Sequence, residues 1–549
     1  MRIPSGLPYA AALLAAGAAL AQPAAIPHLE KRGDATQLVV DGRPFLMLGG
    51  ELTNSASSSL DYLAPYWPKL AAANLNTVLA AVSWELMEPE PGRFDFSLVD
   101  GMIREARRNR LRLIFLWFGS WKNGVSSYTP LWVKRDSRQF PLFLAENGVT
   151  LTYLSVFQDA NWKADARAFA ALMRHIREVD GETHTVVMMQ VENEVGCPGG
   201  TRDHSPAGEA AFNSPVPKQL LDYMVKHREA LIPEFRQQWE SAGSKTTGTW
   251  PDVFGKEPIA NEIFMAWNYA VYVDKVAAAG KAEYALPMFV NVALGERIGQ
   301  YSSGGALPIV LNVWQQGAPH IDLVAPDIYL PNFAEWCARY NRSGNPLWIP
   351  ETRTDAANAF YAIGKHAAMG ISPFAIERAA DASTPYAKAY DTLAQAAPAI
   401  LEAQAKGAIG AVMLNADNPA QALKLGNYTL HFAIGRMRRP PAAAAGAAQA
   451  SGESYAIAIA TGPDDYVILG NGIQVTFTAS NPGPSPAAIG ALEEGVYVEG
   501  NWVPGRRLNG DDIMLDYNAQ NHAVKNESGQ GLRLVGDAPR ILRVKLYQY

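Results

Sequence analysis

Eight short apolar runs recur between residues 45 and 376, and this repetition constrains the fold more than any other feature of the chain. Most of the runs are followed by a longer amphipathic stretch. A strand that is buried on both faces is expected to be continuously apolar, because helices cover one face and packed core covers the other. Strand–helix repetition of this number predicts an α/β fold, the (β/α)8 TIM barrel. The predicted strands span residues 45–48, 77–82, 111–118, 186–189, 288–292, 323–329, 347–349 and 371–376.

The last helix of this series has recognisable ends. Thr384 is the predicted N-cap and Pro385 the first helical residue, because a hydroxyl accepts from free backbone N–H groups and proline has no N–H to leave unpaired. Pro398 predicts a kink inside the helix, and Gly407 follows its end.

The sequence pattern changes after about residue 420. Helical periodicity fades, and short alternating runs appear between turn signals such as Gly470-Asn471-Gly472. This pattern favours an antiparallel β-sandwich. We therefore predict a barrel domain over residues 22–420 and a C-terminal sandwich domain over residues 421–549. A Pro-, Ala- and Gly-rich stretch at residues 440–454 is predicted to be a flexible loop or linker.

The first 21 residues resemble an export signal. Arg2 supplies a positive region, residues 10–20 are apolar, and Ala19-Leu20-Ala21 fits the A-x-A pattern of signal cleavage. A membrane anchor is the alternative, but the run is shorter than the about 20 apolar residues that span a bilayer. The pattern predicts a signal peptide over residues 1–21, a secreted or periplasmic protein, and no membrane association after cleavage.

Composition and motifs argue against several kinds of partner. The net charge is only −6 and the positive residues are scattered, so nucleic acid is not an expected partner. HExxH, CxxC and EF-hand patterns are missing, as is a GxGxxG motif after a strand, so we expect neither a metal nor a nucleotide cofactor. The two cysteines, Cys197 and Cys337, are too few for a disulfide scaffold. Whether they pair is left open, as is the oligomeric state.

The residues that follow the strands of a TIM barrel line its active site. Carboxylates and aromatic rings dominate these positions here, and histidine is not among them. Aromatic rings stack on the apolar faces of sugars, while carboxylates and amides bind hydroxyl groups. The set therefore favours a carbohydrate ligand, an oligosaccharide or polysaccharide. Its members are Glu51, Glu85, Trp117, Trp121, Asn193, Glu194, Asp327, Tyr329 and Glu351.

Glu194 and Glu351 are the predicted reactive pair. Hydrolysis of a glycosidic bond needs one carboxyl group to protonate the leaving oxygen and another to attack the anomeric carbon or activate water. Each of the two residues follows a predicted buried strand, and carboxylates are rarely kept beside apolar runs without a partner or a function. Taken singly, either could be a salt-bridge member instead, and Glu51 or Glu85 could pair with a nearby arginine.

The residues around Glu194 resemble a known family. Residues 190–196 have the sequence QVENEVG, which is similar to the QVENEYG signature of family 35 glycoside hydrolases, the clan A β-galactosidases. Residues 83–96 are similar to that family's WNxHEPxxGxFDF stretch. The resemblance implies that Glu194 is the acid/base and that Asn193 binds the sugar 2-hydroxyl. It also implies that Glu351 is the nucleophile and that Tyr329 lies beside it.

The chain departs from this family in places. Glu85 and Met87 replace the usual asparagine and histidine, and residues 117–121 replace the common CAEW segment with its sugar-contacting glutamate. The β domain resembles that of a bacterial branch, some members of which remove galactose from plant xyloglucan. The resemblance implies a retaining exo-acting β-galactosidase without cofactors. Glu85 and Glu51 would hold sugar hydroxyls, and Trp121 would stack on a sugar face.

Other functions stay open. One is that of another clan A exo-glycosidase, such as a β-glucosidase or an α-L-arabinopyranosidase. A second is that of a carbohydrate-binding protein without catalysis. A metal-dependent barrel hydrolase is disfavoured because histidine ligands do not cluster.

Overall fold

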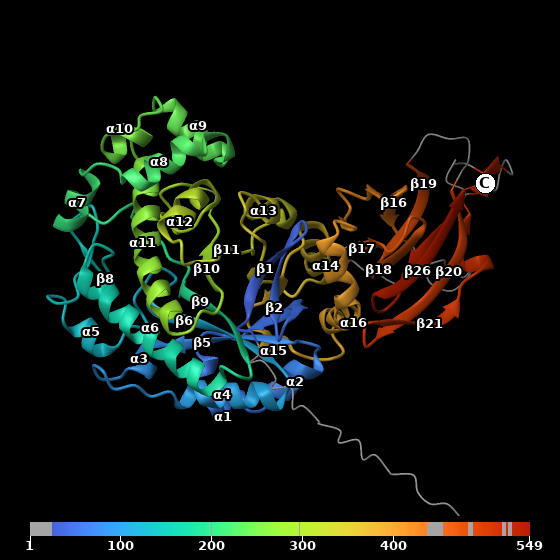
Figure 1. Cartoon of the computed structure of the whole chain (residues 1–549), viewed down its shortest axis with the longest axis horizontal. Coiled ribbons are helices and arrows are strands. Elements are labelled where there is room, and N and C mark those ends of the chain that lie inside the picture. The colour runs from blue at the N-terminus through green and yellow to red at the C-terminus, as the bar shows by residue number, and fades with distance from the viewer. Residues whose placement is uncertain are drawn as a thin grey trace, which may run out of the picture.

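The predicted barrel strands form one parallel eight-stranded sheet (Figure 1). Its order is β11-β10-β9-β6-β5-β4-β13-β12. Ile328, just after β11, bridges in parallel to Thr352 of β12, and its N–H donates to the Glu351 carbonyl at 2.9 Å, which closes the sheet. The TIM-barrel prediction is confirmed. The strands are β4 (Met47–Glu51), β5 (Thr77–Ser83), β6 (Arg112–Lys122), β9 (Val186–Asn193), β10 (Met288–Ala293), β11 (Leu323–Asp327), β12 (Ile349–Thr352) and β13 (Gly370–Pro373).

The computed structural model describes residues 25–198, 200–295, 297–435, 454–480, 487–515, 517–518, 523–524 and 530–548. The predicted signal peptide, residues 1–21, and residues 440–453 of the predicted linker lie outside the described residues. Within the described ranges, every helix is too short or too polar to cross a membrane.

Two strand boundaries differ from those predicted. The run 45–48 is divided between β3 (Arg43–Phe45) and β4, because β3 belongs to a separate three-stranded sheet with β1 (His28–Arg32) and β2 (Ala35–Val40). The run 111–118 continues to Lys122. β6 bulges at this end, since Trp117 pairs with Val191 while Lys122 pairs with Asn193. The bulge decides which side of the barrel each residue at the end of β6 faces.

A closed apolar core fills the interior of the barrel. Ile114, Leu116, Phe289 and Trp348 of the barrel pack there with Leu38 of β2. The N-terminal sheet therefore contributes side chains that plug the barrel. As a result, an active site can lie only at the other end of the barrel, where the strands have their carboxyl ends.

Helices cover the outside of the barrel (Figure 1). The predicted last helix is α16 (Pro385–Ala405): the Thr384 hydroxyl accepts from the Ala387 N–H at 3.2 Å, and Pro398 lies inside the helix. The other helices are α1 (Leu60–Leu63), α2 (Trp67–Ala72), α3 (Trp84–Met87), α4 (Ser97–Arg108), α5 (Leu131–Arg135), α6 (Asp159–Asp180), α7 (Pro206–Phe212), α8 (Lys218–Lys226), α9 (Pro233–Ser241), α10 (Trp250–Phe254), α11 (Ile259–Glu283), α12 (Leu311–Gly317), α13 (Phe333–Tyr340), α14 (Ala356–His366) and α15 (Ile376–Ala379).

Short elements fill the loops between these helices and strands. A hairpin follows β6, and the 3-10 turns lie mostly in the barrel loops. The hairpin consists of β7 (Leu142–Leu144) and β8 (Thr150–Leu154). The 3-10 turns are η1 (Ala56–Ser58), η2 (Arg228–Ala230), η3 (Pro308–Val310) and, near the C-terminus, η4 (Gly510–Asp512).

The C-terminal part is an antiparallel sandwich, as predicted. A six-stranded sheet, β14-β17-β18-β26-β20-β21, faces a five-stranded sheet, β15-β16-β19-β25-β22, across a second apolar core. The strands are β14 (Ile409–Leu414), β15 (Ala420–Leu425), β16 (Tyr428–Ile434), β17 (Ser454–Ala460), β18 (Asp465–Asn471), β19 (Ile473–Ala479), β20 (Ala487–Val498), β21 (Asn501–Arg507), β22 (Met514–Leu515), β25 (Gln530–Leu534) and β26 (Arg540–Gln548), with the small pair β23 (Tyr517–Asn518) and β24 (Ala523–Val524).

The sandwich packs directly on the barrel helices. Phe360 of α14 and Tyr455 of β17 have ring centroids 4.7 Å apart. Gly364 of α14 approaches the sheet so closely that a Cβ there would lie 2.7 Å from the side chains of Ala411 and Ile457. β14, which contains Ala411, precedes the predicted domain boundary at residue 420. The two domains therefore share one continuous apolar core at this contact.

Candidate active site

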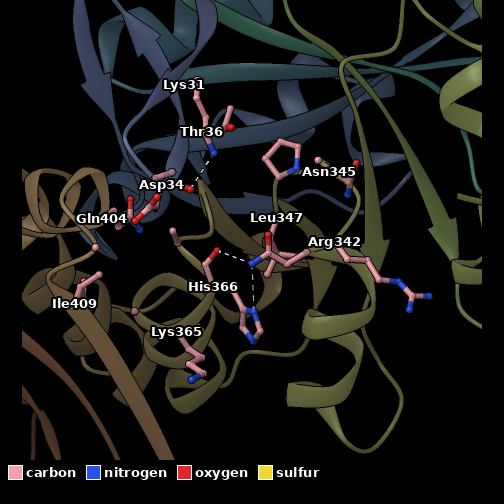
Figure 2. Close-up of a pocket in the computed structure, with 17 residues that line it drawn as sticks. Lys31, Asp34, Thr36, Arg342, Asn345, Leu347, Lys365, His366, Gln404 and Ile409 are labelled. Atoms are coloured by element: carbon pink, nitrogen blue, oxygen red, sulfur yellow. Dashed lines mark hydrogen bonds between the residues drawn. The ribbon is translucent and has the colours of Figure 1, made fainter. Parts of the chain in front are cut away.

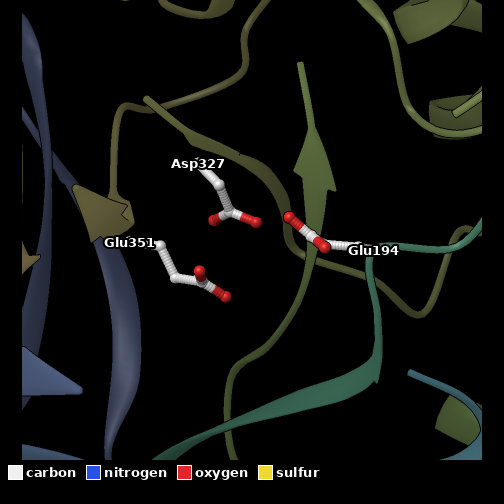
Figure 3. A group of neighbouring side chains, drawn as sticks. All are labelled: Glu194, Asp327 and Glu351. Carbon is white, nitrogen blue, oxygen red and sulfur yellow. The ribbon is translucent and has the colours of Figure 1, made fainter. Parts of the chain in front are cut away.

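Three carboxyl groups meet at the ends of three barrel strands (Figure 3). Glu194 follows β9 directly, Asp327 ends β11, and Glu351 lies in β12. One oxygen atom of each lies within 4.8 Å of an oxygen atom of the other two, and all three residues are buried. The fold thus brings together the predicted reactive pair, Glu194 and Glu351, and adds Asp327 to it.

Asn291 of β10 links the three groups. Its side-chain oxygen accepts from the Glu194 N–H at 2.9 Å. Its amide nitrogen donates to Asp327 Oδ2 at 2.7 Å and to Glu351 Oε1 at 3.4 Å. Because both ends of this planar amide are engaged, it fixes the positions of the carboxyl groups relative to one another.

Glu194 is held in an unusual backbone conformation. Its φ is 43°, in the left-handed region that costs a non-glycine residue about 1–3 kcal/mol and persists only where the surroundings enforce it. The Tyr301 hydroxyl donates to the Glu194 carbonyl at 2.8 Å, and the Asn123 amide donates to Glu194 Oε2 at 2.7 Å. These contacts direct the carboxyl group toward Glu351.

Glu351 has both a polar partner and a perturbed acidity. The Tyr329 hydroxyl donates to Glu351 Oε2 at 3.0 Å, so Tyr329 lies where the family resemblance placed it. Burial raises the pKa of Glu351 to about 7, and the Glu194 charge also raises it. The positive charge of Lys122 and the hydrogen bond from Tyr329 act in the opposite direction. With a pKa of about 7, the Glu351 carboxyl group is mostly protonated in mild acid and becomes ionised as the pH rises through neutrality.

Glu51 at the end of β4 is a fourth buried carboxyl group. Neither of its oxygen atoms has a hydrogen-bond partner in the described part of the chain. Burial, followed by the charge of Glu351, raises the Glu51 pKa well above its usual value. The pKa of Asp327 is also raised well above its usual value, by burial and then by Glu351 and Glu194. Buried acceptors without partners are costly, so they favour a ligand that donates hydrogen bonds.

Asn193 lies beside Glu194 and contacts Lys122. The Lys122 Nζ donates to Asn193 Oδ1 at 2.8 Å, while Asn193 Nδ2 is buried without a partner among the described residues. The Asn193 side chain also lowers the Glu351 pKa, so its unpaired amide nitrogen faces that carboxylate. Glu192 does not contribute to this site, because its carboxylate accepts from the Trp121 N–H at 2.7 Å.

Glu85, a predicted sugar ligand, lies outside the cluster. It is in α3, its side chain is 40% exposed, and its carboxylate pairs with Lys134 of α5 at 3.4 Å. Helix α3 begins immediately after β5, so the chain turns away from the barrel axis before Glu85 is reached. The structure does not bring Glu85 to the carboxylates.

The prediction that Trp121 stacks on a sugar is wrong. Its indole is fully buried on the helix side of the barrel, edge-on to Tyr269 and Tyr272 of α11, with ring centroids 5.3 Å and 4.5 Å away. The bulge in β6 turns Lys122 inward and leaves Trp121 facing the helices. The aromatic residue at the end of this strand is therefore part of the core.

We expect Trp121→Ala to lower the free energy of unfolding by about 3–5 kcal/mol, as for other large core side chains. Denaturant unfolding measures this loss. Trp162→Ala is the matched control, because Trp162 on α6 is only partly buried and its loss should cost much less. Unchanged stability in Trp121→Ala would contradict the core assignment.

Sequence reasoning missed several residues of the site. Asn291 is the single polar residue of an otherwise apolar predicted strand, and that exception was a usable signal. Lys122 was hidden because the apolar run ends at Phe118, four positions earlier than the strand itself. Tyr301 and Asn123 lie in loops, and the sequence pattern offers no signal for them. Asp327 was among the predicted strand-end residues, but sequence reasoning assigned it no catalytic or binding role.

The carboxylate cluster is also where a cation could bind. Glu194, Asp327 and Glu351 each offer one oxygen within 4.8 Å of the others, and hard cations such as Mg²⁺ and Ca²⁺ prefer such ligands. Catalytic zinc sites instead use histidine, and this cluster has none. The expectation of a metal-free site stays a prediction. Among the described residues both cysteines are unpaired and buried, and neither belongs to this cluster.

A cavity of about 320 Å³ lies away from this cluster (Figure 2). Leu347 and Ala367 in its lining precede the barrel strands β12 and β13, which places the cavity at the end of the barrel opposite the carboxylates. Lys31 donates to the Asp34 carbonyl at 3.0 Å, and Asn341 donates to the His366 carbonyl at 3.1 Å. Since barrel enzymes react at the other end, we assign this cavity no part in catalysis.

Parts of the chain match known families. Residues 67–260 match the glycoside hydrolase family 42 model, described as Beta-galactosidase, and residues 386–520 match a Domain of unknown function (DUF5597). The first match includes Asn193 and Glu194 but ends before Asp327 and Glu351. The segment is thus similar to β-galactosidases, while the resemblance to family 35 in particular stays a prediction.

Comparison with individual proteins also finds β-galactosidases. The chain is 31% identical over 196 residues to the Beta-galactosidase of Xanthomonas manihotis, a match that covers 33% of this chain and 29% of that protein. The chain thus spans less than a third of that relative. The solved β-galactosidase of Marinomonas ef1 aligns with TM-score 0.45 and 13% identity over 65% of this chain and 60% of that one. The β-galactosidase of Bacillus circulans sp. alkalophilus aligns with TM-score 0.45 and 14% identity over 65% and 57%.

Proposed function

We propose that this protein is a retaining, exo-acting β-galactosidase that removes terminal β-D-galactosyl residues from oligosaccharides or polysaccharides. The observation that carries the proposal is the convergence of the Glu194 and Glu351 oxygens within 4.8 Å. Retaining enzymes need carboxyl groups about 5–5.5 Å apart, whereas inverting enzymes hold them about 6.5–9.5 Å apart to leave room for water. The similarity of residues 67–260 to β-galactosidases supports the choice of sugar.

In the proposed reaction, Glu351 attacks the anomeric carbon while the bond to the leaving oxygen breaks and takes the proton of Glu194. This step leaves a galactosyl ester on Glu351. Glu194 then removes a proton from water, which displaces Glu351 and releases galactose with its original configuration. Tyr329 and Asn291 hold Glu351 in the geometry for attack.

The substrate hydroxyls would meet groups that have no partner within the described chain. Glu51 offers two buried acceptors, Asp327 one more, and Asn193 one buried donor. Binding a polyhydroxylated ring would satisfy these groups and remove the cost of burying them unpaired. Plant xyloglucan side chains are one polysaccharide to test, and export to the periplasm or the medium belongs to the same proposal.

A panel of nitrophenyl glycosides tests the function. We expect the β-D-galactoside to be hydrolysed fastest, ahead of the β-D-glucoside and the α-L-arabinopyranoside. NMR of the first product should show β-galactose before mutarotation. Faster hydrolysis of the β-D-glucoside would indicate a different exo-glycosidase. Sugar binding without any turnover would indicate a carbohydrate-binding protein.

The same assay tests the metal-free expectation. Because the proposed mechanism uses only side chains, added EDTA should leave the rate of galactoside hydrolysis unchanged. If EDTA removes activity and Mg²⁺, Mn²⁺ or Ca²⁺ restores it, the cluster of Glu194, Asp327 and Glu351 is a cation site rather than a pair of acid and nucleophile.

A further inference from the structure

Lys122 is a buried cation beside Asn193, close enough to Glu51 and Glu351 for its charge to act on both. It ends β6, is only 6% exposed, and pairs across the sheet with Asn193 of β9. Its Nζ lies 5.2 Å from the centre of the Phe118 ring and donates to Asn193 Oδ1 at 2.8 Å. Among the described residues, the hydrogen bond of its ammonium group goes to this amide rather than to a carboxylate. Burying an ammonium group without a carboxylate partner costs free energy, so its retention here indicates a functional role.

The hydrogen bond from Lys122 determines which end of the Asn193 amide is free. An ammonium group only donates, so it must meet the oxygen of the amide and never the nitrogen. Asn193 Nδ2 is then left as a donor. It faces the Glu351 carboxylate, whose pKa it lowers, and it makes no full hydrogen bond among the described residues. Without Lys122, the amide could rotate by half a turn and present an acceptor instead.

Lys122 also supplies positive charge to a strongly acidic site. Glu51 comes from β4, Glu194 from β9, Asp327 from β11 and Glu351 from β12, and the charge of Glu377 on α15 also acts on Glu51. The uncharged hydroxyls of Tyr301 and Tyr329 complete the surroundings. Against this negative charge, Lys122 lowers the pKa of both Glu51 and Glu351.

We propose that Lys122 is a positioning residue of this site: it orients the Asn193 amide so that Nδ2 donates to a substrate hydroxyl. This role rests on the proposed glycosidase function. It adds a residue that neither the sequence pattern nor the comparisons assign.

The test compares Lys122→Met, Asn193→Ala and the double variant on an aryl β-galactoside and on its 2-deoxy analogue. A hydrogen bond to a charged group predicts a loss of kcat/KM of about 10- to 100-fold for Lys122→Met on the ordinary substrate. We expect a much smaller loss on the 2-deoxy analogue. If Lys122 acts through Asn193, the double variant should lose little more than Asn193→Ala alone.

The pH profile is a second measurement, which a purely structural role for Lys122 would not change. The acidic limb of the kcat/KM profile reports ionisation of the nucleophile. Because Lys122→Met removes a positive charge, that limb should shift to higher pH by about one unit. Lys122→Arg keeps the charge and should leave the limb in place. Lys163→Met, at an exposed lysine of α6, is the control and should change neither quantity. Thermal unfolding of each variant checks that it is folded.

The outcomes separate this role from the proposed function. If wild-type protein cleaves no glycoside, the proposed function fails and the Lys122 role fails with it. If wild-type protein cleaves galactosides, the variants decide. Equal losses on both substrates in folded Lys122→Met, additive losses in the double variant, or an unmoved acidic limb would each overturn the role of Lys122.

Discussion

Replacing Glu351 with glycine should remove nearly all of the proposed β-galactosidase activity, and azide should restore a reaction with a different product. Loss of a covalent nucleophile costs on the order of 10⁵-fold or more in other enzymes that form covalent intermediates. The glycine variant leaves space beside Tyr329 where azide can enter and attack the anomeric carbon from the α face. The expected product is α-galactosyl azide, identified by NMR.

Glu146→Gly is the matched control, because Glu146 is an exposed turn residue between β7 and β8. Its activity should equal that of the wild type with and without azide. The nucleophile assignment fails if Glu351→Gly retains wild-type turnover, or if azide yields the β-galactosyl product.

Replacing Glu194 with alanine should slow the enzyme to a degree that depends on the leaving group. General acid catalysis contributes about 10²- to 10⁴-fold, and a poor leaving group needs all of it. We therefore expect a large loss on a galactosyl disaccharide and a small effect on the first step with a dinitrophenyl galactoside. Stopped-flow measurement of the dinitrophenol burst separates that step from hydrolysis of the galactosyl-enzyme.

Azide distinguishes Glu194 from Glu351 by stereochemistry. In Glu194→Ala, azide attacks the galactosyl ester on Glu351, so the product should be β-galactosyl azide. Glu182→Ala is the control, since Glu182 is exposed and precedes β9, whereas Glu194 follows it. An equal loss on good and poor leaving groups would falsify the assignment of Glu194 as acid/base.

The barrel could be predicted because its signal is local and repeated. Each buried strand needs its own apolar run, and the run 77–82 gives β5 almost to the residue. The C-terminal sandwich follows from equally local alternation and turns. The ends of the strands were less certain: the run 111–118 gave no sign that β6 continues to Lys122, because a bulge with polar residues breaks the apolar pattern.

The convergence of Glu194 and Glu351 could be predicted because parallel strands bring their carboxyl ends to the same edge of the barrel. Glu194 and Glu351 follow their strands closely, so the fold class alone places both near the axis. Trp121 shows the limit of this argument. Position after a strand does not say whether a side chain faces the axis or the helices, and packing against Tyr272 placed its ring in the core.

By itself, the sequence determined the barrel, the sandwich and the two carboxylates, since each depends on residue types within one short segment. Only the tertiary structure decided that Asn291 links the carboxyl groups, that Tyr301 holds Glu194, and that Lys122 lies among the acids beside Asn193. These contacts join segments far apart in the chain. Their geometry is set by a strand bulge, a left-handed residue and loop packing, and none of these has a periodic pattern in the sequence.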